Sequence, residues 1–278
     1  MTNAKETTKC ILTVAGSDSG GGAGIQADLK TIAALDAYGM CVITAVTAQN
    51  TQGVQDVHEI PPEFVRRQFD SVASDISIDA VKTGMLAGPE TVRVVADRIR
   101  TYKLQKVVVD PVLSAKGGTS LLYDDAVSVL KTELIPLATV VTPNIPEAEI
   151  LSGLPIVSPE DMKQAARIIH LLGAKNVVIK GGHAAGDPVD LLFDGEQFFE
   201  FRSERLSTAD THGTGCTFAT ALAIGIAEDL SVRDAVDRAK RLIFAAIRSS
   251  LRIGQGHGPV NPMAFISRHK IRREFNVE

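Results

Sequence analysis

The sequence contains no tryptophan, few other aromatic residues and only three cysteines among its 278 residues. Aromatic residues make up 5% and hydrophobic residues 45%, so the interior must be largely aliphatic, as in folds with buried parallel strands. The cysteines, Cys10, Cys41 and Cys216, are widely spaced and form no CxxC pair. This usage excludes a disulfide framework and a zinc ribbon, and it is typical of a reducing compartment.

Charge and long apolar runs are also scarce. A net charge of −4 argues against the basic face that nucleic-acid binding requires. No run reaches the roughly 18 apolar residues of a transmembrane helix. The first residues, "MTNAKETTK", lack the apolar region of a signal peptide. We therefore expect a cytoplasmic protein with no nucleic-acid or membrane partner.

Two kinds of segment alternate along the chain. Short β-branched runs predict buried strands at 10–16, 41–48, 106–112, 138–144 and 176–182. Amphipathic stretches predict helices at 23–39, 61–76, 89–102 and 158–173, and two more between 213 and 252. Asp194-Gly195 between two apolar runs predicts a hairpin. The alternation indicates an α/β protein with a mostly parallel sheet covered on both faces. We expect one domain over 1–278, with its core at 10–262.

Several polar or sulfur-containing residues stand where predicted strands end. Gln49 follows the second strand, Met85 follows "DAVKTG", and three more strands end at Asp110, Asn144 and Lys180. Ligands of open parallel sheets bind beyond the carboxyl ends of the strands. These residues are therefore expected to share one site.

Two glycine-rich turns precede predicted helices. The first is "AGSDSGGGAGIQAD" (15–28), and the second is "DTHGTGCT" (210–217). In each, free N–H groups and the positive end of the helix dipole are expected to hold an anion or, in the first, a polar ring. Cys216 lies in the second turn, where the same field predicts a stabilised thiolate.

The segment "TPNIPEAE" (142–149) is a third candidate. Asn144 and Glu147 are three residues apart where a strand passes into a helix. This spacing allows two interpretations, a hydrated Mg²⁺ site or a helix cap with a first-turn acid. Together with the two glycine turns, it indicates a nucleoside triphosphate with magnesium on one side and a small acceptor on the other.

Six motifs, in order, carry a specific resemblance: "AGSDSGGGAGIQADLKT", "TAQNTQGV" (47–54), "KTGMLA" (82–87), "TPNIPEAE", "IKGGH" (179–183) and "DTHGTGCT". Over roughly 10–262 the chain resembles the hydroxymethylpyrimidine/phosphomethylpyrimidine kinases of thiamine biosynthesis, in the ribokinase superfamily. The resemblance implies a three-layer α/β/α sandwich. It also implies phosphorylation by ATP, with Mg²⁺, of 4-amino-5-hydroxymethyl-2-methylpyrimidine and of its monophosphate, and a homodimer.

On the acceptor side, the resemblance implies that Gln49 binds the aminopyrimidine edge. Five further residues are expected to line or support that pocket: Gly16, Ala23, Asp28, Met85 and Val112.

On the nucleotide side, the resemblance implies that Lys180 approaches the phosphates. The expected anion hole consists of Gly213, Thr214, Gly215 and Cys216, and Cys216 stands where the sugar kinases of the superfamily have an aspartate base. Asn144 and Glu147 match the magnesium–phosphate motif, and Asp110 is expected to order a metal-bound water. Gly256 and Val260 are expected to border the adenine. A loop at 115–122 is expected to close over the site.

Three alternatives remain open. A pyridoxal or pyridoxine kinase would also act on a flat ring with a hydroxymethyl arm, although the Gln49 amide matches an aminopyrimidine edge better. An NAD-binding oxidoreductase would use the G-x-G-x-x-A match at 22–27, but no acidic residue ends the second strand. A non-catalytic pyrimidine sensor would not need the phosphate-binding residues.

Overall fold

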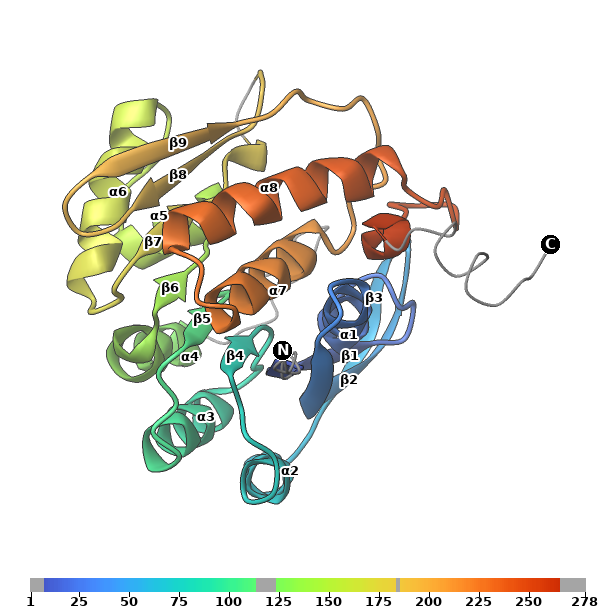
Figure 1. Ribbon diagram of the computed structural model, residues 1–278, viewed down its shortest axis with the longest axis vertical. Coiled ribbons are helices and arrows are strands. Elements are labelled where there is room, and N and C mark those ends of the chain that lie inside the picture. Colours follow the sequence, from blue (N-terminus) through green and yellow to red (C-terminus); the bar gives the residue numbers. More distant parts are fainter. Residues whose placement is uncertain (1–7, 114–123, 184–185, 266–278) are drawn as a thin grey trace, which may run out of the picture.

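The computed structural model describes residues 8–113, 124–183 and 186–265, so the predicted closing loop at 115–122 lies outside the described residues. Within them, nine strands form one sheet in the order β3-β2-β1-β4-β5-β6-β7-β8-β9 (Figure 1). The strands are β1 Cys10–Asp18, β2 Tyr38–Asn50, β3 Gly53–Glu59, β4 Ala80–Thr83, β5 Val107–Val109, β6 Val140–Val141, β7 Val177–Ile179, β8 Val189–Phe193 and β9 Phe198–Arg202.

The six central strands, from β2 to β7, are parallel, as the strand–helix alternation predicts. Antiparallel strands complete both edges. The predicted turn at Asp194-Gly195 joins β8 to β9. The β2–β3 hairpin at the other edge was not predicted, because β3 is largely exposed and lacks a run of apolar residues.

Helices cover both faces of the sheet (Figure 1). They are α1 Gly24–Ala34, α2 Pro62–Ala73, α3 Pro89–Thr101, α4 Asp124–Val129, α5 Ile145–Ser152, α6 Pro159–Leu171, α7 Thr214–Ala227 and α8 Val232–Arg248, with short turns η1 Leu130–Leu134, η2 Ile135–Leu137, η3 Gly181–His183 and η4 Pro262–Phe265. Helices α1, α7 and α8 share one core with the sheet, and α2 to α6 share the other. No described helix is long and apolar enough to cross a bilayer.

The two apolar cores explain the continuous hydrophobicity of the central strands. Along β5, Val107 and Val109 face one core and Val108 faces the other. A strand whose two faces are both covered gains from an apolar side chain at every position. The same topology brings the carboxyl ends of the parallel strands to one edge, where α1, α5 and α7 begin.

A buried ion pair fastens α1 to the sheet beneath this edge. Asp28 in α1 and Lys82 in β4 are both 0% exposed, and Lys82 Nζ lies 2.9 and 3.0 Å from the two carboxylate oxygens. Thr13 in β1 and Thr220 in α7 donate to the same carboxylate at 2.5 and 2.7 Å. These bonds satisfy a charge that burial would otherwise penalise heavily. The predicted place of Asp28 in the acceptor pocket is therefore wrong, because its carboxylate serves the interior.

Candidate active site

A cavity of about 720 Å³ opens beyond the carboxyl ends of the parallel strands. Most of the predicted site residues line it: Gly16, Ala23, Gln49, Met85, Asp110, Val112, Asn144, Glu147, Lys180, Gly213, Thr214, Gly215 and Cys216. The cavity therefore brings together the five residues that the strand-end rule selected, Gln49, Met85, Asp110, Asn144 and Lys180.

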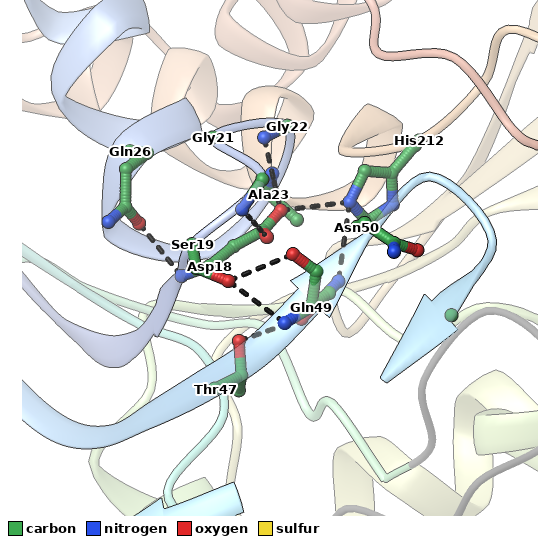
Figure 2. A network of polar contacts seen from close by, with 12 residues as sticks. Asp18, Ser19, Gly21, Gly22, Ala23, Gln26, Thr47, Gln49, Asn50 and His212 are labelled. Carbon is green, nitrogen blue, oxygen red and sulfur yellow. Dashed lines mark hydrogen bonds and ion pairs between the residues drawn. The ribbon is translucent and has the colours of Figure 1, made fainter. Parts of the chain in front are cut away.

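The first glycine turn, between β1 and α1, is filled by a side chain of its own (Figure 2). Asp18 accepts hydrogen bonds from the N–H groups of Gly20, Gly22 and Ala23 at 2.8, 3.0 and 2.8 Å, and its carbonyl oxygen accepts from Gly21 at 2.9 Å. The expectation that these N–H groups hold a bound anion is therefore wrong. The same observation removes the argument for a dinucleotide at 22–27.

Asp18 also connects the first turn to the second. Its Oδ2 lies 2.9 Å from Nε2 of His212, and that nitrogen lies 3.4 Å from Nε2 of Gln49 (Figure 2). Burial favours the neutral form of Asp18, but His212 and the N–H groups of Ala23 and Gly20 outweigh it and lower the carboxyl pKa. Asp18 is thus a permanent internal anion. This role of Asp18 was not predicted, although Asp before Ser-Gly-Gly-Gly is a typical turn signal.

Among the described residues, no side chain caps the second glycine turn, at the start of α7. Gly213 adopts φ 81° at the N-cap. First-turn N–H groups of a helix project from its N-terminal end. Gly213 to Cys216 line the cavity. This turn matches the predicted anion cradle in geometry.

The two turns are in direct contact. A Cβ placed on Gly213 would lie 1.8 Å from the carbonyl oxygen of Gly22, and a Cβ on Gly22 would lie 2.4 Å from Cδ2 of His212. Both positions therefore require glycine, the first also because of its positive φ.

Lys180 lies beside the open turn. Its Nζ is 2.7 Å from Oδ1 of Asp110, and it lies 3.3 Å from where a Cβ on Gly215 would stand. Burial lowers the pKa of Lys180, but the carboxylates of Asp110 and Glu147 raise it by more, so the ammonium stays charged. A fixed positive charge thus adjoins the N–H groups at the start of α7.

Asn144 and Glu147 form a reciprocal capping box at the start of α5. The Glu147 N–H donates to Asn144 Oδ1 at 2.9 Å, and the Asn144 N–H donates to Glu147 Oε2 at 2.8 Å. The helix-cap interpretation is therefore confirmed, while both residues still line the cavity. Burial raises the pKa of Glu147 to about 7, and Asp110 contributes to the shift while Lys180 opposes it.

Cys216 departs from its predicted electrostatics. Burial raises the pKa of its thiol to about 11, and Asp28 and Asp110 add to the shift. Lys82 and the Gly24 N–H oppose it without reversing it. The predicted thiolate is wrong, because the helix field competes with burial and two carboxylates. The resting residue is a neutral thiol.

Part of the cavity lining was not predicted from sequence. It includes the apolar residues Pro188, Leu206, Phe218, Ile243, Phe244 and Ile247, together with charged residues such as Asp190, Arg205 and Lys240. Of these, Ile243, Phe244 and Ile247 belong to the apolar stripe of α8, and the sequence alone would assign that stripe to the core.

The structure places Gly256 and Val260 outside the cavity lining. The Gly256 N–H donates to Thr51 Oγ1 at 3.2 Å, and Val260 is 3% exposed, with its N–H bonded to the carbonyl oxygen of His212 at 3.0 Å.

The chain is similar to known proteins over most of its length. Residues 18–261 match the family model of phosphomethylpyrimidine kinase. The chain is 58% identical over 252 residues to the thiamine biosynthesis bifunctional protein ThiED of Geobacter sulfurreducens, covering 90% of this chain and 51% of that protein. It is therefore about half as long as that relative. It is 51% identical to the hydroxymethylpyrimidine/phosphomethylpyrimidine kinase of Bacillus subtilis, with 91% and 94% covered.

Solved structures show the same architecture. The ADP complex of Bacillus subtilis pyridoxal kinase superposes with a TM-score of 0.88 at 41% identity, covering 94% of this chain and 99% of that one. Phosphomethylpyrimidine kinase from Clostridium difficile superposes with a TM-score of 0.78 at 42% identity, covering 86% and 100%. The ribokinase-like α/β/α sandwich that the motifs imply is confirmed.

Proposed function

The chain belongs to the phosphomethylpyrimidine kinase family, and on this premise we propose that it phosphorylates the hydroxymethyl group of 4-amino-5-hydroxymethyl-2-methylpyrimidine and then the resulting monophosphate, with ATP as donor. One observation carries the proposal. Lys180 and the open turn of α7 line the same cavity as the amide of Gln49 and the apolar side chains of Leu206, Phe244 and Ile247, and Lys180 Nζ lies 3.3 Å from where a Cβ on Gly215 would stand.

The acceptor pocket suits a flat, nitrogen-rich ring. Gln49 supplies an amide at its edge, and Met85 and Val112 supply apolar surface. An amide offers a donor and an acceptor together, as an aminopyrimidine edge requires. The hydroxymethyl arm would then point toward Cys216 and the start of α7.

Phosphoryl transfer depends on stabilising the charge of a loose transition state rather than on a strong base. The first-turn N–H groups of α7 and the charged Lys180 supply fixed positive dipoles and charge at this place. The neutral thiol of Cys216 contributes shape and a weak hydrogen bond beside the acceptor hydroxyl. Because Asp18 occupies the first turn, the phosphate of the monophosphate must also be accommodated by α7 and Lys180.

Mg²⁺ fits the acidic side of this cavity. The carboxylates of Glu147 and Asp110 are hard oxygen donors, and both residues line the cavity. The described residues contain no cluster of three His, Cys, Asp or Glu side chains that could hold a metal alone. Glu147, Asp110 and Asn144 would therefore share the ion with phosphates and water, and the bound ion would neutralise phosphate charge.

The apolar part of the cavity lining provides a place for a nucleotide base. Leu206, Phe244 and Ile247 belong to it. We assign the adenine of ATP to these side chains rather than to Gly256 and Val260, because only the former line the cavity. Substituting Phe244 by Ala should weaken ATP binding without affecting binding of the pyrimidine.

A pyridoxal kinase is the second candidate, because structures of pyridoxal kinases superpose closely on this chain. The curated relatives at 45–58% identity favour the pyrimidine. ATP turnover with the aminopyrimidine alcohol and with pyridoxal, measured side by side, separates the two. A larger kcat/KM for pyridoxal would reverse the order of the candidates.

The decisive test of two successive transfers is ³¹P NMR of enzyme, ATP and the aminopyrimidine alcohol. We expect a monoester signal that rises and then falls as a diphosphate appears, and direct use of added monophosphate. A monoester that remains the only product, with added monophosphate untouched, would contradict the second transfer.

The proposal includes a homodimer in the cytoplasm, as the family resemblance implies. Sedimentation equilibrium of the purified chain tests the dimer, and fractionation of the source cells tests the compartment. A monomeric mass at micromolar concentration would contradict the first expectation.

A further inference from the structure

The contacts around Asp18 determine where the proton of His212 lies (Figure 2). Asp18 receives three backbone N–H bonds and the contact with His212 Nε2 at 2.9 Å. A carboxylate can only accept, so the nitrogen that faces it must carry a proton. His212 therefore presents Nε2–H, whether or not its other ring nitrogen is protonated.

This proton conflicts with the orientation of the neighbouring amide. Gln49 Nε2 lies 3.4 Å from His212 Nε2, which places two donors face to face. Gln49 Oε1 lies 3.1 Å from Thr47 Oγ1, whose single proton also faces the carbonyl oxygen of Ser17 at 3.0 Å. Rotating the amide by 180° resolves both conflicts. Its oxygen then faces the His212 Nε2–H and shares that proton with the closer Asp18 carboxylate, its nitrogen donates to Thr47, and Thr47 donates to Ser17.

We propose that His212, held by Asp18, fixes the side-chain amide of Gln49 with its oxygen toward His212 and its nitrogen toward Thr47, and that this order of acceptor and donor selects the ring edge that the pocket binds. His212 and Asp18 are thus positioning residues for specificity. The amide orientation stands on these contacts alone, whereas the selected ligand rests on the proposed function.

The backbone at Gln49 supports this role. Its N–H donates to Ser19 Oγ at 2.8 Å, and Ser19 Oγ donates to its carbonyl oxygen at 2.8 Å. The first glycine turn therefore holds the main chain of Gln49, and only its side-chain torsions remain to be set. His212 and Thr47 set the last of them from the two ends of the amide.

A fixed amide distinguishes two otherwise similar pyrimidines. The 4-amino ring presents an amine donor beside a ring-nitrogen acceptor, and the 4-oxo ring presents a carbonyl acceptor beside an N–H donor. The ring cannot turn over to compensate, because its hydroxymethyl arm must point toward α7. A mismatched edge leaves buried polar atoms unpaired, which corresponds to about 5- to 150-fold in affinity.

A matched pair of variants tests this selection. His212→Gln keeps an N–H donor near the position of Nε2, whereas His212→Met is of similar length and has none. Calorimetry with the 4-amino and the 4-oxo hydroxymethyl compounds should show a preference for the former of about 5- to 150-fold in the wild type and in His212→Gln. In His212→Met both compounds should bind within about threefold of each other, because the amide can rotate. A preference unchanged by His212→Met would overturn the proposal.

A measurement on the unaltered protein keeps the proposal falsifiable if the variants do not fold. In ¹⁵N-edited NMR, the side-chain NH₂ of Gln49 should show nuclear Overhauser contacts to the Thr47 methyl group, and His212 should carry a proton on Nε2. Contacts from that NH₂ group to the His212 ring, with none to Thr47, would overturn the proposed orientation. If neither pyrimidine binds, the proposed function fails, while the spectrum still decides the orientation of the amide.

Discussion

The two glycine turns of this protein have similar sequences, but only the first is occupied by an acidic side chain of the protein. Both precede a helix at the same cavity, and the sequence predicts an anion at each, or a polar ring at the first. The turn before α1 already holds one, the carboxylate of Asp18, whereas the turn before α7 has no side-chain cap among the described residues. A glycine-rich sequence therefore shows only that several backbone N–H groups can point toward one acceptor. Whether a ligand can use them depends on whether the chain supplies its own acceptor.

This difference indicates that the two turns have different roles. The filled turn is a rigid support, because its carboxylate and Ser19 hold the acceptor pocket around Gln49. The open turn lines the cavity, where we propose that its N–H groups bind phosphate, and Lys180 lies beside it. The following predictions test this division, from the largest expected effect to the smallest.

The contact between the turns should be the most sensitive point. Gly213→Ala would combine a positive φ of 81° with a Cβ 1.8 Å from the Gly22 carbonyl oxygen. We expect a loss of more than about 3 kcal/mol in the free energy of unfolding, measured by urea denaturation. Gly153→Ala is the matched control, because φ is 74° there and nothing lies within 4 Å of the added Cβ. Equal losses for both variants would mean that the contact contributes nothing.

The open turn should dominate the rate. Lys180→Met removes the charge beside α7 and should lower kcat about 10²- to 10³-fold, with pyrimidine affinity unchanged. Lys30→Met is the control, because Lys30 is exposed and binds the carbonyl oxygen of Gly21 in the filled turn at 2.6 Å. Steady-state kinetics should show kcat of the control within about twofold of wild type. A comparable fall in both variants would remove the distinction between the turns.

Removing the Asp18 carboxylate should leave the first turn able to bind an added anion. Asp18→Ala leaves the N–H groups of Gly20, Gly22 and Ala23 without their acceptor and should cost about 1–3 kcal/mol of stability. Added formate should then raise the melting temperature of Asp18→Ala by more than that of the wild type, because it replaces the carboxylate. Identical responses to formate would show that the emptied turn binds no anion.

The capping boxes at the starts of α5 and α6 should affect the free energy of unfolding in opposite directions as pH changes. In the unfolded chain Glu147 loses its proton near the usual value, whereas in the folded protein its pKa is about 7. The folded form therefore keeps an extra proton between these values, and stability should fall as pH rises from about 4.5 to about 7. Glu147→Gln should abolish that decline in urea midpoints.

The control is the box at the start of α6. There the Ser158 hydroxyl and the backbone N–H groups of Val157 and Ser158 lower the pKa of the half-buried Asp161. Its contribution is present at neutral pH and is lost as pH falls through the lowered value, so Asp161→Asn should reduce stability at pH 7 more than at pH 3. The same pH dependence in both variants would contradict the assignment of Glu147.

The smallest effect is expected at Cys216. A thiol with a pKa of about 11 is almost entirely protonated at neutral pH, so it is poorly suited to act as a base. Cys216→Ala should therefore lower kcat by less than about tenfold, against the roughly 10²–10⁴ typical of a lost general base. A loss in the larger range would show that the bound substrates lower the thiol pKa.

Most of the fold could be predicted because it depends on repeated local patterns. The valines of β5 and the turn at Asp194-Gly195 are clear signals, and the strand-end rule gathers Asp110 and Lys180 without any knowledge of distance. The exposed strand β3 has no such pattern and was missed.

The electrostatics of the site could not be predicted in the same way. The thiol of Cys216 is controlled by burial and by Asp28 and Asp110, which are remote in sequence. Asp28 itself was assigned to the wrong environment, because sequence does not show which polar residue of α1 faces inward. Only Asp18 left a usable local signal, in the glycines that follow it.

The contact between Gly22 and Gly213 also bears on the order of events during synthesis. Three of the four hydrogen bonds to the Asp18 carboxylate come from residues that leave the ribosome within seconds of it, at about 5–20 residues per second. The start of α7 must wait until most of the chain has been made, and its docking closes a very long loop. The nascent protein can thus form the first glycine turn early, whereas His212 and the start of α7 arrive late. The catalytic centre is completed by one of the most non-local steps of folding, so the onset of activity marks the end of the process rather than its beginning.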